Sequence, residues 1–355
     1  MLKIGMLALS AIGLAACSVG ETAPSPPFEA EALSGELILL AAPPDGDTYY
    51  AERAEDIFAF HVGYARAILD AGDDIVVFSG ADVFDDYVEA LGRAHVAPIE
   101  MQDIWMRDFT LSNTAAPVMF RYTAEGQGGG QEGQTEADFV QERFAAVLEA
   151  AGIDFAETDL LNDGGNFVDD YAGNVVASRK FLRDNDLSED EGRRAMRRAT
   201  GARHVAFIEA DEQGGLEHAD GVVAFVAENT LVINAYPEDP TYAADLRADL
   251  EEGLPGVTLH EIVTPYDGRD IYDPRFGSAC GLYTNMLVTP QRIYFPQFGI
   301  PEDREALASV RRWTDREVIP VNSEGVCTMG GGVRCMSLQM RGPAATALLA
   351  YLRGV

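Results

Sequence analysis

The chain is organised around the stretch Met329-Gly330-Gly331-Gly332-Val333-Arg334-Cys335-Met336-Ser337-Leu338-Gln339, in which three glycines precede a single cysteine. Consecutive glycines let the backbone adopt φ > 0 and run close to a ligand. We expect Cys335 to open a short alternating strand and to present its thiol at a crowded site. On this stretch alone, a flexible loop followed by a buried structural cysteine remains an equal alternative.

The first residues have the pattern of an export signal. Lys3 is followed by an apolar run to Gly13 and then by Leu14-Ala15-Ala16-Cys17, as in a bacterial lipoprotein signal (1–17) with Cys17 as the lipid-modified residue. An ordinary secretory signal is the alternative. Residues 18–35, rich in Pro, Ala, Glu and Ser, are predicted to form a flexible tether, and 36–355 a single folded domain. We therefore expect a protein of the cell envelope, held at the membrane by a lipid anchor, or a secreted protein.

Three cysteines remain beyond Cys17: Cys280, Cys327 and Cys335. An odd number in an oxidising compartment leaves one cysteine reduced or paired with an external partner. A Cys280–Cys327 disulfide that spares Cys335 is one arrangement, and the sequence leaves the pairing open.

The charge balance is strongly acidic, with 26 basic against 58 acidic residues and a formal net charge of −32. Phosphate binding needs clustered positive charge, so nucleic acid is excluded as a partner. Cationic substrates suit this balance, although a solvated acidic surface explains most of it.

Hydrophobic patterning predicts alternating strands and helices without an internal linker. The predicted helices cover about 51–71, 81–91, 136–151, 188–200, 241–252, 302–313 and 344–353. The predicted strands and hairpins cover about 36–42, 74–79, 95–100, 116–122, 153–158, 173–178, 204–209, 222–236, 257–263, 284–296 and 317–321. This repetition every 50 to 70 residues or so indicates one closed, pseudo-symmetric α/β array whose loops meet at a central site.

Two upstream stretches gather polar side chains between predicted strands. Residues 103–108 contain Trp105, Arg107 and Asp108, which a structural salt bridge covered by an indole would also explain. Residues 161–170 place acids and Asn166 around a Gly-Gly turn. A hairpin turn is the alternative there; a calcium loop is disfavoured because the spacing does not match the twelve-residue helix-loop-helix pattern.

A third stretch, Glu217-His218-Ala219-Asp220-Gly221, precedes a strong strand. In an extended chain His218 and Asp220 point to the same face, so an imidazole and a carboxylate project side by side. Chance placement of a histidine near an acid is common in so acidic a chain. A zinc site is disfavoured because no second histidine stands at ligand spacing.

As an ordered set these stretches resemble the agmatine deiminase and Porphyromonas-type peptidylarginine deiminase family over about residues 36–353. The matching motifs are Trp-Met-Arg-Asp (105–108), Asp-Gly-Gly-Asn (163–166), His-Ala-Asp-Gly (218–221), Tyr-Thr-Asn (283–285) with Pro-Gln-Phe-Gly (296–299), and Gly-Gly-Gly-Val-Arg-Cys (330–335). The resemblance implies a five-fold pseudo-symmetric α/β propeller of the pentein type, with 36–355 as a single deiminase catalytic domain.

The resemblance also implies residue roles. Cys335 would be the nucleophile, His218 the general acid and then base, and Asp108 and Asp220 the carboxylates that hold a guanidinium. We expect the remaining substrate-binding positions to be Trp105, Asn166, Asn285, Arg121 and Arg334. No metal and no cofactor is implied.

The reaction of a guanidinium with a thiol requires the same carboxylates, cysteine and histidine, independently of the resemblance. A guanidinium is cationic and resonance-stabilised, so its carbon resists attack unless carboxylates fix it against a strong nucleophile. Nearby carboxylates should raise the pKa of the thiol, so its activation must come from an imidazolium or from the positive charge of the substrate. The histidine can protonate departing ammonia, leaving a thiouronium adduct, and then activate the water that releases a ureido product.

Two departures from the agmatine pattern shape the expected substrate. Arg334 stands where agmatine deiminases usually carry histidine, and Asp-Gly-Gly-Asn replaces Glu-Gly-Gly-Ser. We therefore expect conversion of peptidyl or free arginine to citrulline and ammonia, with Arg121 or Arg334 meeting a substrate carboxylate. The alternatives are an agmatine deiminase giving N-carbamoylputrescine and a non-catalytic, cation-binding surface lipoprotein.

Overall fold

The computed structural model describes residues 35–112, 117–211 and 215–355. The predicted signal, Cys17 and residues 18–34 of the predicted tether lie outside the described residues. All elements given below belong to one compact unit, Glu31–Val355.

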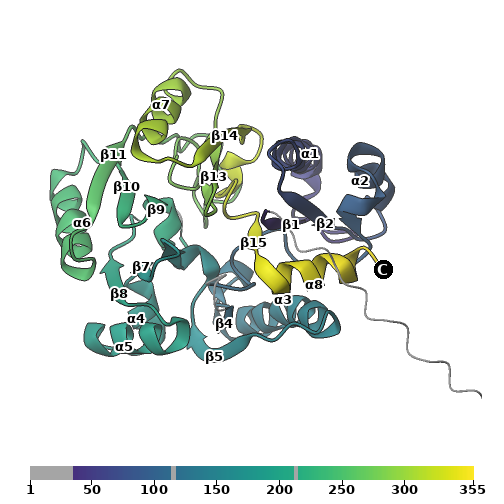
Figure 1. The fold of residues 1–355 in the computed structure, drawn as a ribbon, viewed down its shortest axis with the longest axis horizontal. Helices are drawn as coiled ribbons and strands as arrows, with labels where there is room; N and C mark the ends of the chain where they lie inside the picture. The colour runs from purple at the N-terminus through teal and green to yellow at the C-terminus, as the bar shows by residue number, and fades with distance from the viewer. Residues whose placement is uncertain (1–34, 113–116, 212–214) are drawn as a thin grey trace, which may run out of the picture. The chain divides into compact units, whose positions relative to one another are not determined.

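One unit, a strand, a helical segment and a second strand parallel to the first, occurs five times in the described chain (Figure 1). The helical segments supply the long crossover that a parallel pair requires. In order, the units are β1 (Leu37–Ala41), α1 (Ala54–Asp70) and β2 (Asp74–Phe78); β4 (Val118–Arg121), α3 (Gly130–Ala150) and β5 (Ala156–Leu161); β7 (Asn174–Ser178), α4 (Lys180–Asp184), α5 (Glu189–Thr200) and β8 (His204–Ile208); β10 (Thr230–Asn234), α6 (Pro240–Gly253) and β11 (Thr258–Ile262); and β13 (Arg292–Gln297), α7 (Asp303–Trp313) and β14 (Glu317–Asn322).

Each unit belongs to a separate small sheet, and four of the five sheets gain an antiparallel strand. These added strands are β6 (Val168–Asp169) on β7, β9 (Val223–Ala227) on β10, β12 (Leu287–Val288) on β13 and β15 (Leu338–Met340) on β1. The first sheet also contains the short parallel strand β3 (Val96–Ala97), preceded by α2 (Phe84–Leu91). The fold is therefore mixed α/β.

The last strand of the chain pairs with the first. Leu37 lies opposite Met340 and Leu39 opposite Leu338, so β15 completes the sheet begun by β1, and α8 (Gly342–Leu352) follows it (Figure 1). This pairing places the strand that follows Cys335 in the same sheet as the start of the domain.

Both faces of the first sheet are buried, which explains the uninterrupted apolar sequence Leu-Ile-Leu-Leu-Ala of β1. Leu37 and Leu39 belong to a core cluster with Phe144 of α3, whereas Ile38 and Leu40 pack in a second cluster with α1 residues such as Tyr64. Every residue of β1 is shielded from solvent.

Several predicted boundaries differ from the structure. The strand predicted at 95–100 is only β3, because Arg93–His95 form a 3-10 helix before it. The strand predicted at 153–158 runs from 156 to 161, and the helix predicted from residue 136 begins at Gly130. The helix predicted at 188–200 is α5, which begins with a capping box formed by Ser188 and Glu191.

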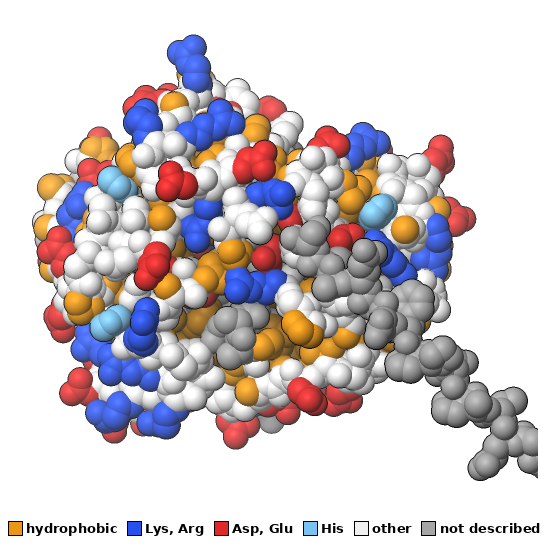
Figure 2. Space-filling view, in the orientation of Figure 1, with side chains coloured by type: hydrophobic (Ala, Val, Ile, Leu, Met, Phe, Trp, Pro, Cys, Tyr) orange, Lys and Arg blue, Asp and Glu red, His pale blue; other side chains and the backbone are white. Residues whose placement is uncertain are grey.

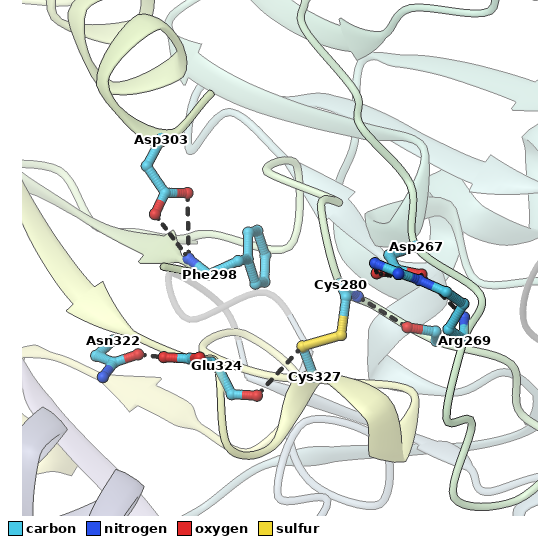
Figure 3. Close-up of a disulfide and its surroundings, with 9 residues drawn as sticks. Asp267, Arg269, Cys280, Phe298, Asp303, Asn322, Glu324 and Cys327 are labelled. Atoms are coloured by element: carbon cyan, nitrogen blue, oxygen red, sulfur yellow. Dashed lines mark hydrogen bonds and ion pairs between the residues drawn. A yellow bond between two sulfur atoms is a disulfide. The ribbon is translucent and has the colours of Figure 1, made fainter. Parts of the chain in front are cut away.

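Cys280 and Cys327 form a disulfide, which decides the pairing that the sequence left open (Figure 3). A backbone hydrogen bond from Ala279 N to Cys327 O, 2.8 Å long, runs beside it. The disulfide therefore joins the connection between β11 and β12 to the connection between β14 and β15. None of the helices in the described ranges combines the length and the apolar character needed to cross a membrane.

Candidate active site

The candidate site is built from the connections between successive sheets. Following the chain, each of these connections supplies at least one site residue: Asp108, Asp163, His218 with Asp220, Asn285 and Cys335. The site therefore forms only when all five sheets are assembled, because no single connection carries all of the functional side chains.

The glycines before Cys335 are needed for close packing. A Cβ at Gly331 would lie 2.4 Å from the Trp105 ring and 2.8 Å from the Cys335 Cβ, closer than real Cβ contacts. Cys335 itself lies in a turn, held by hydrogen bonds from Met336 N to Gly332 O and from Arg107 N to Cys335 O, each 3.0 Å. The expectation that Cys335 opens the strand is wrong, because β15 begins three residues later at Leu338.

Asp108 and the Gly164-Gly165 turn are fitted to each other. Gly165 N donates to Asp108 Oδ1 at 3.1 Å, and Gly164 N donates to the backbone oxygen of Asp108 at 3.1 Å. A Cβ at Gly165 would lie 2.3 Å from His218 Nδ1, so only glycine leaves room for the imidazole. The Gly-Gly turn thus brings Asp108 and His218 together.

His218 lies between two carboxylates. Its Nε2 is 2.9 Å from Asp163 Oδ2 and its Nδ1 is 3.7 Å from Asp108 Oδ1. Burial would lower the pKa of His218, but Asp108 and the hydrogen-bonded Asp163 outweigh it and raise that pKa to about 9. The imidazole is therefore a cation in the free protein at neutral pH, ready to donate a proton.

Asp163 is a site residue to which the sequence assigned no role. It accepts hydrogen bonds from Thr123 N and Thr123 Oγ1, both 2.9 Å, in addition to its contact with His218. Although burial acts the other way, the His218 hydrogen bond lowers the pKa of Asp163. The available signal was its place directly before the Gly-Gly turn.

Asp220 lies beside the thiol, with its Oδ2 3.9 Å from Cys335 Sγ. The prediction that Asp220 and His218 share an extended segment is wrong, because residues Ala219–Gly221 form a 3-10 helix. Asp220 Oδ2 also accepts from Arg334 Nη1 at 2.5 Å, an ion pair in which both side chains are nearly buried.

The environment of Cys335 disfavours the free thiolate. Burial and the carboxylates of Asp220 and Asp108 raise the pKa of the Cys335 thiol well above its usual range, against the opposing effects of Asn285 and Arg334. Burial, with Asp163 and Asp220, likewise raises the pKa of Asp108 to about 7, against the effect of His218. A cation bound between these groups would favour ionisation of both.

The site contains a cavity of about 330 Å³. Its lining includes Trp105, Asp108, His218, Asp220, Asn285 and Cys335, all of which the sequence predicted as site residues. Six acidic side chains contribute to the lining, and its one arginine among the described residues, Arg275, is bound to Asp273. The cavity is suited to a cationic group.

Three predicted substrate-binding residues lie elsewhere. Arg121 is exposed and bonds Asp138, away from the cavity. Asn166 accepts hydrogen bonds from Ser178 N at 2.6 Å and Ala219 N at 3.3 Å, so it supports the segment after His218. Arg334 is buried, with Nη2 donating to Phe167 O at 2.6 Å, and its charge is taken up by Asp220. Neither Arg121 nor Arg334 belongs to the cavity lining, and each is paired with a carboxylate of the chain, so the structure gives no support to the expectation that one of them meets a substrate carboxylate.

No group of three or more His, Cys, Asp or Glu side chains in the described part of the chain is arranged to hold a metal ion. The polar groups of the cavity instead form the pairs described above. What the arrangement can do is hold a cation, attack it with sulfur and transfer protons through an imidazole.

Fold and sequence together place the chain among the C–N hydrolases that act on guanidino groups. Residues 27–341 match the Porphyromonas-type peptidyl-arginine deiminase family, and the chain belongs to that family.

Individual relatives agree with this assignment. A putative agmatine deiminase of Lactococcus lactis is 26% identical over 286 residues, which cover 69% of this chain and 76% of the relative. The structure of agmatine deiminase from Enterococcus faecalis matches with a TM-score of 0.70 at 19% identity, covering 86% of this chain and 93% of that one. A putative arginine deiminase from Porphyromonas gingivalis matches with a TM-score of 0.65 at 19% identity, covering 86% and 96%. At these identities, the two structures establish a shared fold.

Proposed function

We propose that this chain is a cysteine-dependent deiminase that hydrolyses the guanidinium of an arginine-type substrate to a ureido group and ammonia. The observation that carries the proposal is that Cys335, His218, Asp108 and Asp220 line the same acidic cavity. A guanidinium is the cation that can use two carboxylates through bidentate hydrogen bonds while offering sulfur an electrophilic carbon.

The reaction begins when Asp108 and Asp220 hold the guanidinium against Cys335. The bound cation offsets the carboxylates that otherwise raise the pKa of the thiol, so the thiolate forms in the complex. Sulfur attacks the guanidinium carbon, and His218, which is protonated in the free enzyme, donates its proton to the departing ammonia. The neutral imidazole then activates the water that cleaves the thiouronium adduct.

Within this class we favour arginine in peptides as the substrate. Arg121 and Arg334 bond chain carboxylates, and Arg275 bonds Asp273, so these arginines are not available for the α-carboxylate of free arginine. Agmatine is the second candidate, since its additional positive charge suits a lining with six acidic residues.

The test is release of ammonia by the purified mature protein from an arginyl peptide, free arginine and agmatine, with citrulline or N-carbamoylputrescine identified by mass spectrometry. We expect turnover of the peptide, reduced by at least about 10³-fold in Cys335→Ser because the nucleophile is lost. Absence of turnover of all three by the wild-type protein would reject the deiminase. Unaltered cation binding without turnover in both proteins would support a binding lipoprotein instead.

We further propose that the five strand-helix-strand units are related by a five-fold pseudo-rotation around the cavity, as in a propeller. Their repeated order and the contribution of at least one site residue from each connection support this arrangement. An experimental structure in which successive units fail to superpose by rotations of about 72° would contradict it.

For localisation, we propose a lipid anchor at Cys17 on the outer side of the cytoplasmic membrane or in the outer membrane. The motif Leu14-Ala15-Ala16-Cys17 and a disulfide elsewhere in the chain support export to an oxidising compartment. We expect the wild-type protein in the membrane fraction and Cys17→Ser outside it. Equal recovery of the two proteins in the soluble fraction would argue against the anchor.

A further inference from the structure

We propose that Arg107 is a positioning residue whose buried positive charge keeps the carboxylates of Asp108 and Asp220 ionised before a substrate arrives. The inference rests on the proposed function, in which these two carboxylates hold the guanidinium. It gives a role to a buried cation that the reaction steps above do not use.

Arg107 is a buried arginine without a carboxylate partner. It is 3% exposed, and among the described residues its guanidinium donates to Gln339 Oε1 and forms no ion pair. Its Nε is buried and has no hydrogen-bond partner in the same part of the chain. Arg334, which is also buried, is instead paired with Asp220. A structural salt bridge therefore does not explain the presence of Arg107 in residues 103–108.

The isolated charge of Arg107 does not favour folding by itself. A buried charge that is not paired with an opposite charge is costly. Burial, together with the nearby Arg334, lowers the pKa of Arg107 to about 10, so its guanidinium is still a cation at neutral pH. Features that oppose stability in this way are expected at functional sites.

The surroundings of Arg107 fix its charge next to the site. Arg107 N donates to Cys335 O at 3.0 Å. A Cβ at Gly164 would lie 1.9 Å from the Arg107 backbone oxygen and 3.4 Å from its Cδ, so the glycine turn packs directly on this residue. Gln339, which accepts from the guanidinium, donates from its Nε2 to Tyr171 Oη at 2.8 Å. Arg107 is thus held by the cysteine turn, the glycine turn and β15.

The groups that face Arg107 show which charges it affects. The titratable and charged side chains that interact with it electrostatically are Arg334, Tyr171, Asp220, Asp108, Asp169 and Tyr64. Asp220 and Asp108 favour the cationic form of Arg107. Because electrostatic interaction is mutual, Arg107 favours the ionised form of both carboxylates.

Asp108 needs this support because its other surroundings favour the neutral acid. Burial, with Asp163 and Asp220, raises the pKa of Asp108 to about 7, against the effect of His218. Two buried carboxylates that are to share one cation repel each other until that cation binds. Arg107 reduces this repulsion from outside the cavity lining, so it leaves the place of the substrate free.

The test measures the binding of methylguanidine, a small guanidinium cation, to full-length protein in which Cys335→Ser prevents turnover. Calorimetric titrations between about pH 5 and 9 compare this parent protein with versions that also carry a substitution at Arg107. Arg107→Met and Arg107→Gln remove the charge, whereas Arg107→Lys keeps it. Arg66→Met, at an exposed position of α1, is the matched control. Circular dichroism and thermal unfolding establish whether each protein is folded.

The two neutral variants should lose binding at a higher pH than the parent protein. The pH at which binding is half lost should move upward by about one unit, which lowers affinity at pH 7 by about 5-fold. Arg107→Lys should shift by less than half as much because it keeps the charge, and the control should match the parent. An arginine with only a structural role would instead lower affinity at every pH and leave the midpoint in place.

An unmoved midpoint in a folded neutral variant would overturn the proposal, as would equal shifts in Arg107→Lys and Arg107→Met. Failure of both neutral variants to fold would assign the charge to the stability of the chain and would overturn it too. Binding needs no turnover, so a wild-type protein that binds methylguanidine without releasing ammonia from any substrate would reject the deiminase alone. Absence of binding by the parent protein would reject both.

Discussion

At the scale of single residues, the pairing of His218 with Asp163 determines the proton chemistry. The two are 55 positions apart, and their contact depends on the glycine turn that lets the imidazole approach. The sequence identified the histidine by its motif, whereas the place of Asp163 directly before the Gly-Gly turn did not reveal which base it would contact. Contacts between side chains of different connections decide which acid acts on which base.

The raised pKa values of Asp108 and His218 predict a bell-shaped pH dependence of kcat/KM. Below about pH 7 Asp108 gains a proton and loses the charge that holds the guanidinium, and above about pH 9 His218 loses the proton that ammonia needs. Activity should therefore be highest between these values. Initial rates from pH 5 to 11, at substrate concentrations well below KM, measure both limbs.

Asp163→Asn tests the origin of the alkaline limb. Removing a carboxylate that raises the pKa of His218 should move this limb downward by about one unit or more, whereas Asp138→Asn at the surface should not. An alkaline limb at the same pH in Asp163→Asn and wild type would mean that His218 is not the group observed.

Arg334 shows that position in the sequence does not determine which group a side chain contacts. Its place beside the cysteine suggested a contact with a substrate carboxylate, but the structure pairs it with Asp220 and with the backbone oxygen of Phe167. A buried arginine must satisfy its charge and several donors, and three site segments converge where it lies. Sequence position gives proximity to the nucleophile, whereas the neighbouring segments decide what the side chain binds.

At the scale of elements, the helices and the parallel strands were predictable because their apolar spacing is regular. Short strands such as β3 and irregular connections were not, since they contain few residues and depend on contacts with distant segments. The disulfide belongs to this second group. It joins two connections that line the cavity, 47 residues apart in the chain.

The double variant Cys280→Ser/Cys327→Ser should be less stable and bind substrate less well. Opening a cross-link of this span lowers the free energy of unfolding by about 2–4 kcal/mol. The freed connections should raise KM several-fold. Urea unfolding and steady-state kinetics, each compared with wild type under oxidising conditions, provide the measurements.

Treatment of the wild-type protein with dithiothreitol should reproduce the kinetic change if the bond is accessible to reductant. The double variant should then be insensitive to the same treatment. A variant with wild-type KM and unchanged unfolding midpoint would show that the disulfide does not hold the cavity in shape.

At the scale of the whole molecule, the sequence carries a net charge of −32. Figure 2 shows acidic and basic side chains interspersed on the face that it presents. Such a field attracts cations over distances comparable to the Debye length and concentrates them near an acidic cavity. The charge thus affects how fast a cationic substrate arrives more than how the chain folds.

We expect kcat/KM for cationic substrates to fall with ionic strength, more steeply for higher substrate charge. Two peptides with the same arginine, flanked by lysines or by glycines, would be compared between about 20 and 300 mM NaCl. The lysine-flanked peptide should lose several-fold more of its kcat/KM because salt screens its longer-range attraction. Equal salt dependence of kcat/KM for the two peptides would exclude long-range electrostatic attraction as a contribution to kcat/KM of the lysine-flanked peptide.

The sequence alone determined the repeated α/β elements, the acidic balance and the ordered motifs that contain Asp108, His218, Asp220, Asn285 and Cys335. These features are local or compositional, so they can be read without knowing which segments meet. Only the tertiary structure decided the Asp163–His218 and Asp220–Arg334 pairs, the disulfide and the exclusion of Arg121 from the cavity. Each of these depends on side chains from distant connections, whose contacts are set by the packing of whole sheets.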